Sequence, residues 1–292
     1  MECKLIDALQ MDMSMLSITG ADIFYNRGIT GQDVTVAVID TGLAQHEAIP
    51  SNRIIGGRNF TSEGTIDDYT DFNGHGTHVA GIIGAEENRY FRGMAPKCKF
   101  LILKVLDRNG SGSSDALVRA VEYAVEQNVD IINMSLGTNV DDPSMRKAIQ
   151  KAVAKNISVC CAAGNSGDGN ASTMESDYPG AYEEVICVGA MTKQYSVAPF
   201  SNSNRFVDLV APGKDILSTY LGNGYVSLSG TSMATPVVSG ALALLLQYTK
   251  KEFGRRLLES ELYGLLIKCT KTLKVERSLQ GNGYLSLIEY DK

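Results

Sequence analysis

The chain has 292 residues, of which 44% are hydrophobic and 21% are charged, which predicts one large domain with a substantial core. The formal net charge is −6 without long runs of like charge, which argues against a nucleic-acid partner. The apolar run at 241–246 is too short to span a membrane, so no membrane partner is expected.

Along the chain, short apolar runs alternate with segments of helical periodicity. Residues 1–30 are expected to be irregular apart from a short helix at 21–27, and residues 43–73 are expected to be loops. Strands are predicted at 34–39, 100–106, 129–134, 157–162, 185–188, 206–210 and just after 281–283. Helices are predicted at 115–127, 144–155, 232–248 and 260–269, with a small-residue helix opening within 73–81. This alternation predicts an α/β fold with a doubly wound, mostly parallel sheet and helices on both faces.

Charged residues interrupt the first 20 positions, where a secretory signal would need an apolar stretch. The six cysteines are scattered, and none has the spacing of metal ligands. Together these features predict a location in the reducing cytoplasm.

The stretch 229–236, Ser-Gly-Thr-Ser-Met-Ala-Thr-Pro, directly precedes the most apolar predicted helix. Pro236 is expected in the first turn of that helix, where proline is tolerated. Ser232 would then lie at the helix N-terminus, where free N–H groups and the helix dipole stabilise an oxyanion beside a nucleophilic hydroxyl. Taken alone, the stretch is better interpreted as a Ser/Thr-rich loop with a helix cap.

A nucleophilic serine needs a base, and the chain contains three histidines, His46, His75 and His78. His75 lies between two glycines that let its ring reach a cleft, so we assign it as the base and His78, one turn later, as structural. Asp40 ends an apolar strand and is expected to be buried, where an unpaired carboxylate would be costly. Asp40 is therefore the candidate that orients the base.

Asn165 follows the apolar strand at 157–162. Its amide and the N–H of Ser232 would together form an oxyanion hole. By itself, Gly-Asn-Ser-Gly is an ordinary turn sequence. Ligands of doubly wound sheets bind beyond the carboxyl ends of the strands, so side chains that follow several strands are expected to meet in one site.

Four ordered motifs resemble those of the subtilisin-like serine proteases. They are Asp40-Thr41-Gly42, His75-Gly76-Thr77-His78-Val79-Ala80-Gly81, Ala163-Gly164-Asn165 and Gly230-Thr231-Ser232-Met233-Ala234-Thr235-Pro236. Within that family the chain is most similar to the bacterial intracellular subtilisins. The resemblance implies a serine endopeptidase with Asp40, His75 and Ser232 as catalytic triad and Asn165 in the oxyanion hole, acting on extended peptides or unfolded proteins.

The resemblance also implies a set of substrate-binding residues. Ser111 and Gly112 form one edge that pairs with an extended substrate, and Ser135, Leu136 and Gly137 form the other. The pocket for the P1 side chain, the residue before the cleaved bond, is implied at Ser135-Leu136-Gly137, Ala162-Ala163-Gly164 and Asp177. A carboxylate at its base would favour Arg or Lys at P1. The alternative is that Asp177 is a solvated loop residue.

The same resemblance bears on metal binding, although no metal or other cofactor is expected for catalysis. The family's tight structural calcium site is predicted to be absent, because 45–49 lacks the expected Asp and 86–93 carries Arg89 and Arg92. A weaker calcium site near Gly180, Tyr182, Val185 and Asp208 stays open.

The expected domain organisation is an N-terminal segment, 1–30, followed by one peptidase domain, 31–292, that includes the C-terminal helix and strand. The run Cys3-Lys4-Leu5-Ile6-Asp7 resembles half of the short inhibitory leader of intracellular subtilisins, but the interpretation as an unstructured or docked terminus is favoured slightly. The resemblance also suggests a homodimer. Two functional alternatives remain: a leader-removing protease of the lanthipeptide type, and a catalytically idle subtilase fold that acts as a binding protein.

Overall fold

The computed structural model describes residues 4–5 and 12–288. Within these residues a central sheet has the strand order β11-β12-β8-β7-β6-β5-β2-β4-β3. Its strands are β2 (Thr35–Asp40), β3 (Ile54–Asn59), β4 (Lys99–Lys104), β5 (Ile131–Met134), β6 (Ser158–Ala162), β7 (Ile186–Met191), β8 (Leu209–Pro212), β11 (Thr270–Lys271) and β12 (Tyr284–Leu285). Neighbouring strands are parallel except β11 and β12, which confirms the predicted mostly parallel sheet.

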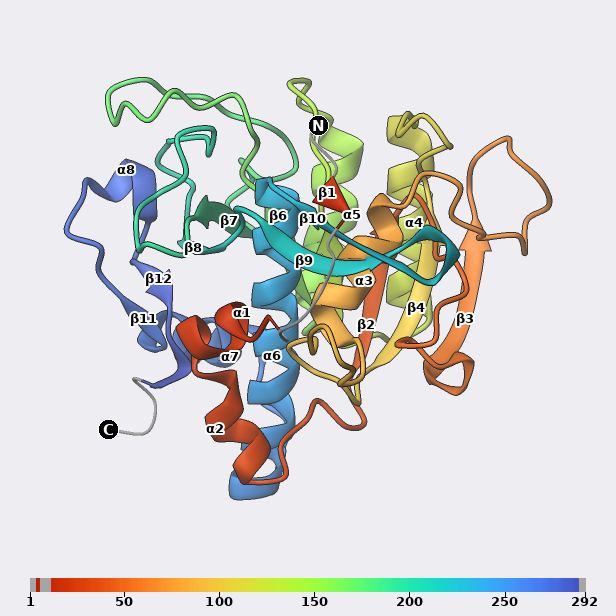
Figure 1. Ribbon diagram of the computed structural model, residues 1–292. Coiled ribbons are helices and arrows are strands. Elements are labelled where there is room, and N and C mark those ends of the chain that lie inside the picture. Colours follow the sequence, from red (N-terminus) through yellow and green to blue (C-terminus); the bar gives the residue numbers. More distant parts are fainter. Residues whose placement is uncertain (1–3, 6–11, 289–292) are drawn as a thin grey trace.

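Helices cover both faces of this sheet (Figure 1). One face carries α1 (Ser14–Thr19), α2 (Ala21–Asn26), α3 (His75–Gly84), α6 (Thr231–Phe253) and α7 (Glu259–Lys268). The other face carries α4 (Ser114–Glu126) and α5 (Pro143–Ala154). A short helix, α8 (Arg277–Gln280), precedes β12.

Strand β2 shows why the apolar runs form this sheet. Val36 and Val38 point into the core beneath α3 and α6, whereas Ala37 and Ile39 point into the core beneath α4 and α5. Successive side chains of a strand alternate between faces, so a strand covered on both faces is apolar throughout. The strand therefore delivers Asp40, its last residue, to the carboxyl edge of the sheet.

A second, antiparallel sheet lies beside α3 and consists of β9 (Ile216–Tyr220), β10 (Gly224–Leu228) and β1 (Lys4–Leu5). The hairpin of β9 and β10 leads directly into α6. The backbone of Lys4–Leu5 pairs with Val226 and Ser227 of β10. The rest of the leader-like run, Cys3 and Ile6-Asp7, lies outside the described residues.

Several helices, strands and boundaries predicted from the sequence differ from those in the structure. The segment 43–73 contains strand β3, the segment 1–30 contains helix α1, and the hairpin of β9 and β10 was not predicted. The large helix runs from Thr231 to Phe253, so Pro236 is its sixth residue and lies beyond the first turn. The N–H that Pro236 lacks would have donated to the carbonyl of Ser232, the second residue of the helix. The proline therefore costs the helix one hydrogen bond near its start.

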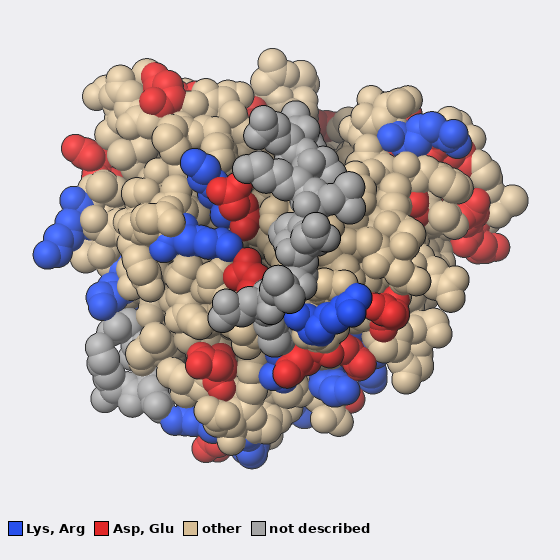
Figure 2. All heavy atoms as spheres, in the orientation of Figure 1, with Lys and Arg blue, Asp and Glu red and all other residues tan. Residues whose placement is uncertain are grey.

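On the face in Figure 2, lysine and arginine side chains are interspersed with aspartate and glutamate. Ion pairs on the molecule include Arg255 with Glu261 at 2.7 Å and Lys151 with Glu122 at 2.6 Å. Within the part of the chain that the structure describes, no helix is long and apolar enough to cross a membrane.

Candidate active site

The side chains of Asp40 and His75 form a hydrogen-bonded pair at the carboxyl edge of the sheet. Asp40 is fully buried at the end of β2, and its Oδ1 accepts hydrogen bonds from His75 Nδ1 at 2.8 Å and from the Thr41 N–H at 2.7 Å. The side chain of His75 stays 21% exposed and lines the adjoining cavity. The pair has the geometry of a base and the carboxylate that orients it.

The charge state of His75 depends on its surroundings. Burial lowers the pKa of His75, but the charge and hydrogen bond of Asp40 and the charge of Asp71 outweigh burial, so that the pKa is raised above its ordinary value. A ring that binds a proton readily is suited to accept one from a hydroxyl group.

Helices α3 and α6 both begin at this edge of the sheet. At the start of α3, the Gly76 N–H donates to Thr41 Oγ1, just beyond β2, at 2.8 Å. At the start of α6, Thr231 Oγ1 accepts from the Gly164 N–H, just beyond β6, at 3.2 Å. Both helices then run back over the same face of the sheet, so they are parallel.

The two helices also pack in register. A Cβ on Gly240 of α6 would stand 3.2 Å from the carbonyl oxygen of Ile83 of α3. Ile83 follows His75 by eight positions, and Gly240 follows Ser232 by the same eight. Parallel helices in contact at these positions place His75 and Ser232 at the same level, one at the start of each helix.

Asn165 lies beside Ser232 and is held by the start of α6. Its Oδ1 accepts from the Thr231 N–H at 2.8 Å and from Thr231 Oγ1 at 3.1 Å. A Cβ on Gly230 would stand 3.6 Å from both Asn165 Nδ2 and the Ser232 backbone nitrogen, so these two donors flank the same point. With Oδ1 engaged, the amide N–H groups of Asn165 are directed away from Thr231.

The other two histidines form hydrogen bonds with the backbone. His78 is fully buried in α3, and its Nε2 donates to the carbonyls of Val226 at 3.0 Å and Ile216 at 3.1 Å. Burial lowers the pKa of His78 to about 3. His46 is buried too, and its Nδ1 accepts from the Ala48 N–H at 3.1 Å. The assignment of His78 as structural agrees with these contacts.

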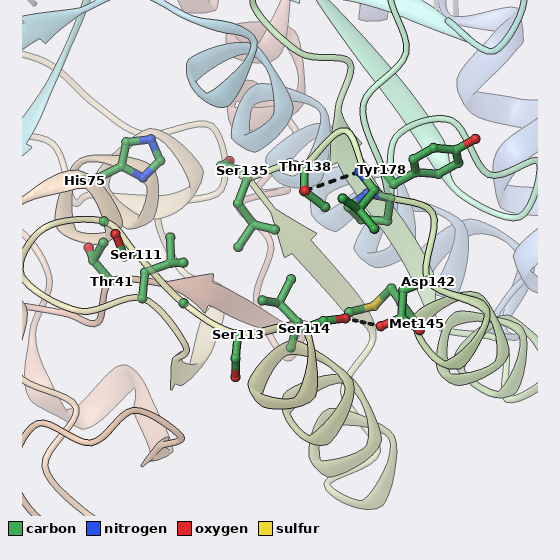
Figure 3. Close-up of a pocket in the computed structure, with 18 of the residues that line it drawn as sticks. Thr41, His75, Ser111, Ser113, Ser114, Ser135, Thr138, Asp142, Met145 and Tyr178 are labelled. Carbon is green, nitrogen blue, oxygen red and sulfur yellow. Dashed lines mark hydrogen bonds between the residues drawn. The ribbon is translucent and has the colours of Figure 1, made fainter.

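A cavity of about 870 Å³ extends from His75 across the sheet edge toward α4 and α5. Figure 3 shows His75 at one end, Ser135 in the middle and Ser114, Asp142 and Met145 at the other. The predicted edge residues Ser111, Gly112, Ser135, Leu136 and Gly137 all line it. Ser111 and Gly112 follow a hydrogen-bonded turn at 107–110, whereas Ser135, Leu136 and Gly137 directly follow β5.

Asp177 lies where the segments after β5 and β6 converge. A Cβ on Gly137 would stand 3.3 Å from the Cβ of Asp177, and no side-chain atom fits on Gly164 because the carboxylate of Asp177 occupies that space. Asn202, fully buried, donates from Nδ2 to Asp177 Oδ2 at 3.2 Å and to the Ala163 carbonyl at 2.9 Å. The structure thus brings Gly137, Ala163, Gly164 and Asp177 together.

Sequence reasoning missed Asn202 and Asp71. Asn202 lies in an ordinary-looking Ser-Asn-Ser run, and only the fold brings it to Asp177. Asp71 accepts four hydrogen bonds around the start of α3. Its spacing before Asn73-Gly74-His75 is typical of an Asx turn, a signal that was available in the sequence.

Cationic side chains occupy the region of the family's tight calcium site. In the loop 86–93, Arg92 pairs with Glu87 at 3.2 Å, and Lys97 pairs with Glu86 at 3.3 Å. The backbone carbonyl of Tyr90 accepts from the Asp12 N–H at 2.6 Å. Among residues 12–288 and 4–5, no group of three or more His, Cys, Asp or Glu side chains is placed to hold a metal ion.

Asp208 lies where the sequence left a weaker calcium site open. Its Oδ1 accepts from the Tyr263 hydroxyl at 2.6 Å and its Oδ2 from the Cys187 N–H at 2.8 Å. Burial raises the pKa of Asp208, and the cationic Arg205 lines the same surface hollow. A cation there would compete with these contacts for the carboxylate.

Comparisons with known proteins identify the family of the chain. The chain is 53% identical over 265 residues to an intracellular serine protease of Paenibacillus polymyxa, a match that covers 89% of this chain and 81% of that protein. It is 46% identical over 281 residues to the major intracellular serine protease of Bacillus subtilis (strain 168), covering 95% and 88%. It is 42% identical over 228 residues to subtilisin DY of Bacillus licheniformis, covering 77% and 81%. The profile of the Subtilase family matches residues 31–284, and the chain belongs to this family of serine proteases.

Proposed function

We propose that this protein is a serine endopeptidase that cleaves peptide bonds with a catalytic triad of Asp40, His75 and Ser232. The observation that carries the proposal is the 2.8 Å hydrogen bond between buried Asp40 and the partly exposed ring of His75. The register of α3 and α6, with His75 and Ser232 at the start of each helix, supports it.

In the proposed reaction, Ser232 Oγ attacks the carbonyl carbon of the substrate while His75 Nε2 accepts the hydroxyl proton. Asp40 holds Nδ1–H of the ring and stabilises the imidazolium. The intermediate collapses, the C–N bond breaks, and the leaving amine takes the proton from His75. Water then attacks the acyl-enzyme by the same proton transfers, which releases the acid and restores Ser232.

The tetrahedral intermediate carries a negative oxygen that needs hydrogen-bond donors. We assign this role to Asn165 Nδ2 and the Ser232 N–H, which flank one point near Gly230. The bonds from Thr231 to Asn165 Oδ1 fix the amide before substrate arrives, so little reorganisation is needed during reaction.

We further propose a preference for Arg or Lys at P1. Asp177 lies against Gly137 and Gly164, so its carboxylate would be at the base of a P1 pocket formed between them and would pair there with a guanidinium or ammonium group. The alternative of a solvated loop aspartate is disfavoured by the hydrogen bond from buried Asn202 to Asp177 Oδ2.

The proposed substrates are extended peptides or unfolded proteins, because Ser111-Gly112 and Ser135-Gly137 offer main-chain pairing along the cleft. Two relatives are named intracellular proteases, and we propose the cytoplasm for this protein as well. Within that setting, removal of a leader from one precursor is a narrower alternative to general turnover. A preference for Arg or Lys at P1 favours removal of a leader from one precursor over general turnover.

A peptide-library cleavage profile tests this proposal. The wild-type protein should cut within extended peptides, mostly after Arg or Lys, and Ser232→Ala should cut none of them. Thermal unfolding of both proteins establishes that the variant is folded. Absence of cleavage by folded wild-type protein would favour the alternative of an idle subtilase fold that acts as a binding protein.

A further inference from the structure

Helix α3, which carries His75, cannot cap its own N-terminus. The N-cap residue is Gly74, with φ of 101°, and it has no side chain to accept the first N–H groups. Gly76 follows His75 directly, so the backbone on both sides of the proposed base is intrinsically free. The position of the imidazole ring therefore depends on groups outside the helix.

The carboxylate of Asp71 supplies part of the missing cap, while the N–H groups of His75 and Gly76 donate to Asn73 Oδ1 and Thr41 Oγ1. Its Oδ1 accepts from the N–H groups of Asn73 at 2.9 Å and Gly74 at 2.8 Å. Its Oδ2 accepts from the Thr77 N–H at 2.9 Å and from Thr77 Oγ1 at 2.7 Å. Asp71 is only 2% exposed, and its negative charge lies at the positive end of the helix dipole.

The same residue connects the helix to the turn that follows Asp40. Thr77 Oγ1, held by Asp71, accepts from the Ala44 N–H at 2.9 Å. The segment that ends in Asp71 lies against Gly42, where a Cβ would stand 3.2 Å from the Asp71 backbone nitrogen. Asp71 thus contacts both elements that must stay aligned for the bond between Asp40 and His75.

We propose that Asp71 is a positioning residue for catalysis, which fixes His75 against Asp40 and adds a second negative charge that stabilises the imidazolium formed during reaction. This inference rests on the proposed function of His75 as general base. It differs from a simple helix cap because it includes an electrostatic effect on the ring.

The electrostatic surroundings of His75 support a stabilising effect of the Asp71 charge on the imidazolium. Burial lowers the pKa of His75, and the charge of Asp71 acts together with Asp40 to raise it. Asp71 itself is ionised over the working range, because burial raises its pKa but its four hydrogen bonds lower that pKa below the ordinary value. A charge held permanently in place needs no reorganisation during the reaction.

The test is Asp71→Asn, which keeps the size of the side chain and removes its charge. We expect kcat to fall about tenfold with KM changed less than about twofold, because only the transition state gains from the charge and the alignment. The acidic limb of the pH profile of kcat/KM should move to lower pH. An unmoved acidic limb in active-site-titrated, folded protein would overturn the inference.

Two further variants separate charge from structure. Thr77→Val removes the hydroxyl bridge between Asp71 and Ala44 but keeps the carboxylate, so it should lower the melting temperature and leave the acidic limb in place. Asp71→Glu keeps the charge but displaces it, so kcat should fall while the acidic limb of the pH profile stays unchanged. This variant also provides a test if Asp71→Asn does not fold. A limb displaced to lower pH in Thr77→Val or Asp71→Glu would contradict the electrostatic role.

Failure of this inference can be told apart from failure of the proposed function. If Ser232→Ala retains wild-type activity, the triad itself is wrong. If Ser232→Ala is inactive and Asp71→Asn has the wild-type pH profile, only the role of Asp71 is wrong.

Discussion

Asn202 Nδ2 donates a hydrogen bond to Asp177 Oδ2 at 3.2 Å, and both residues lie against Gly164. The amide of Asn202 also holds the Ala163 carbonyl and accepts from the Ser166 N–H, so it cannot move freely. A carboxylate fixed in this way at the junction of two strand ends can discriminate between substrates, because its position is set before binding.

Asp177→Ser should abolish the preference for Arg and Lys at P1. Loss of a charge-assisted hydrogen bond to the half-buried carboxylate should lower kcat/KM for P1 Arg relative to P1 Leu roughly 30-fold, at about 2 kcal/mol. The measurement is kcat/KM for matched peptides that differ only at P1. The control is Asp168→Ser, an exposed acidic residue of the same loop. Equal P1 selectivity in wild type and Asp177→Ser would reject the pocket assignment.

Asn165→Ala should lower kcat about 100-fold to 1,000-fold and leave KM nearly unchanged, since the lost donor acts on the oxyanion. Thr231→Val should have a smaller effect, because the Thr231 N–H still binds Asn165 Oδ1. Steady-state kinetics on one peptide measure both variants. A rise in KM at constant kcat would instead place Asn165 in ground-state binding.

The activity should depend on the neutral form of His75. Since the pKa of His75 is raised above its ordinary value, kcat/KM should fall as the pH drops through that raised pKa, which lies above 6.5. Asp40→Asn should remove the negative charge that contributes most to raising the pKa of His75. The activity should therefore fall strongly, and the remaining activity should shift to lower pH. A wild-type acidic limb below pH 6.5 would contradict the structure.

Stability should fall in acid partly because of His78. Folded His78 stays neutral down to about pH 3, whereas an unfolded histidine binds a proton near its ordinary value of 6.5. Between these values the unfolded state binds more protons, so the free energy of unfolding falls as pH decreases, by up to about 1.4 kcal/mol per pH unit. His78→Gln should flatten this slope.

Urea unfolding of the Ser232→Ala protein and of its His78→Gln derivative, compared from pH 7 to 4, measures that slope without self-digestion. His46, whose pKa burial also lowers, remains in both proteins and cancels in the comparison. Identical slopes would mean that His78 is protonated in the folded protein.

Calcium should not bind tightly. Around the loop 86–93 the carboxylates of Glu86 and Glu87 are paired with Lys97 and Arg92, and a bound ion would have to displace these cations. Isothermal titration of chelator-treated protein should show no submicromolar site, and removal of calcium should leave the melting temperature nearly unchanged. At millimolar calcium, weak binding that disappears in Asp208→Asn would establish the second site.

The predictable parts of this fold are those that local sequence determines. The run Val-Thr-Val-Ala-Val-Ile before Asp40 can only be a strand buried on both faces, and the small residues around His75 suit a tightly packed helix start. The positions of Asp40 and Asn165 after predicted strands then indicated one edge of a parallel sheet. No local signal conflicted with that arrangement.

The missed strands lack a strong local pattern. Strand β3 reads Ile-Ile-Gly-Gly-Arg-Asn, whose glycines weaken any strand signal, and one of its isoleucines, Ile55, is 50% exposed. It forms because β4 offers it a parallel edge. Strand β10 begins with Gly224, contains Ser227 and is paired with β9.

The unpredicted site residues depend on long-range contacts. Asn202 is 25 positions from Asp177 in the chain, and Thr231 is 66 positions from Asn165. Neither pair has a spacing that periodicity can reveal, so only the folded chain identifies Asn202 and the Thr231 side chain as supports of the site.

The most direct test of the central claim is labelling with a fluorophosphonate, which reacts with an activated serine hydroxyl. Wild-type protein should be labelled at one site, and mass spectrometry should locate the adduct on Ser232. Ser232→Ala and His75→Ala should both remain unlabelled although folded. Absence of label on folded wild-type protein, or a label on any other serine, would contradict the triad of Asp40, His75 and Ser232.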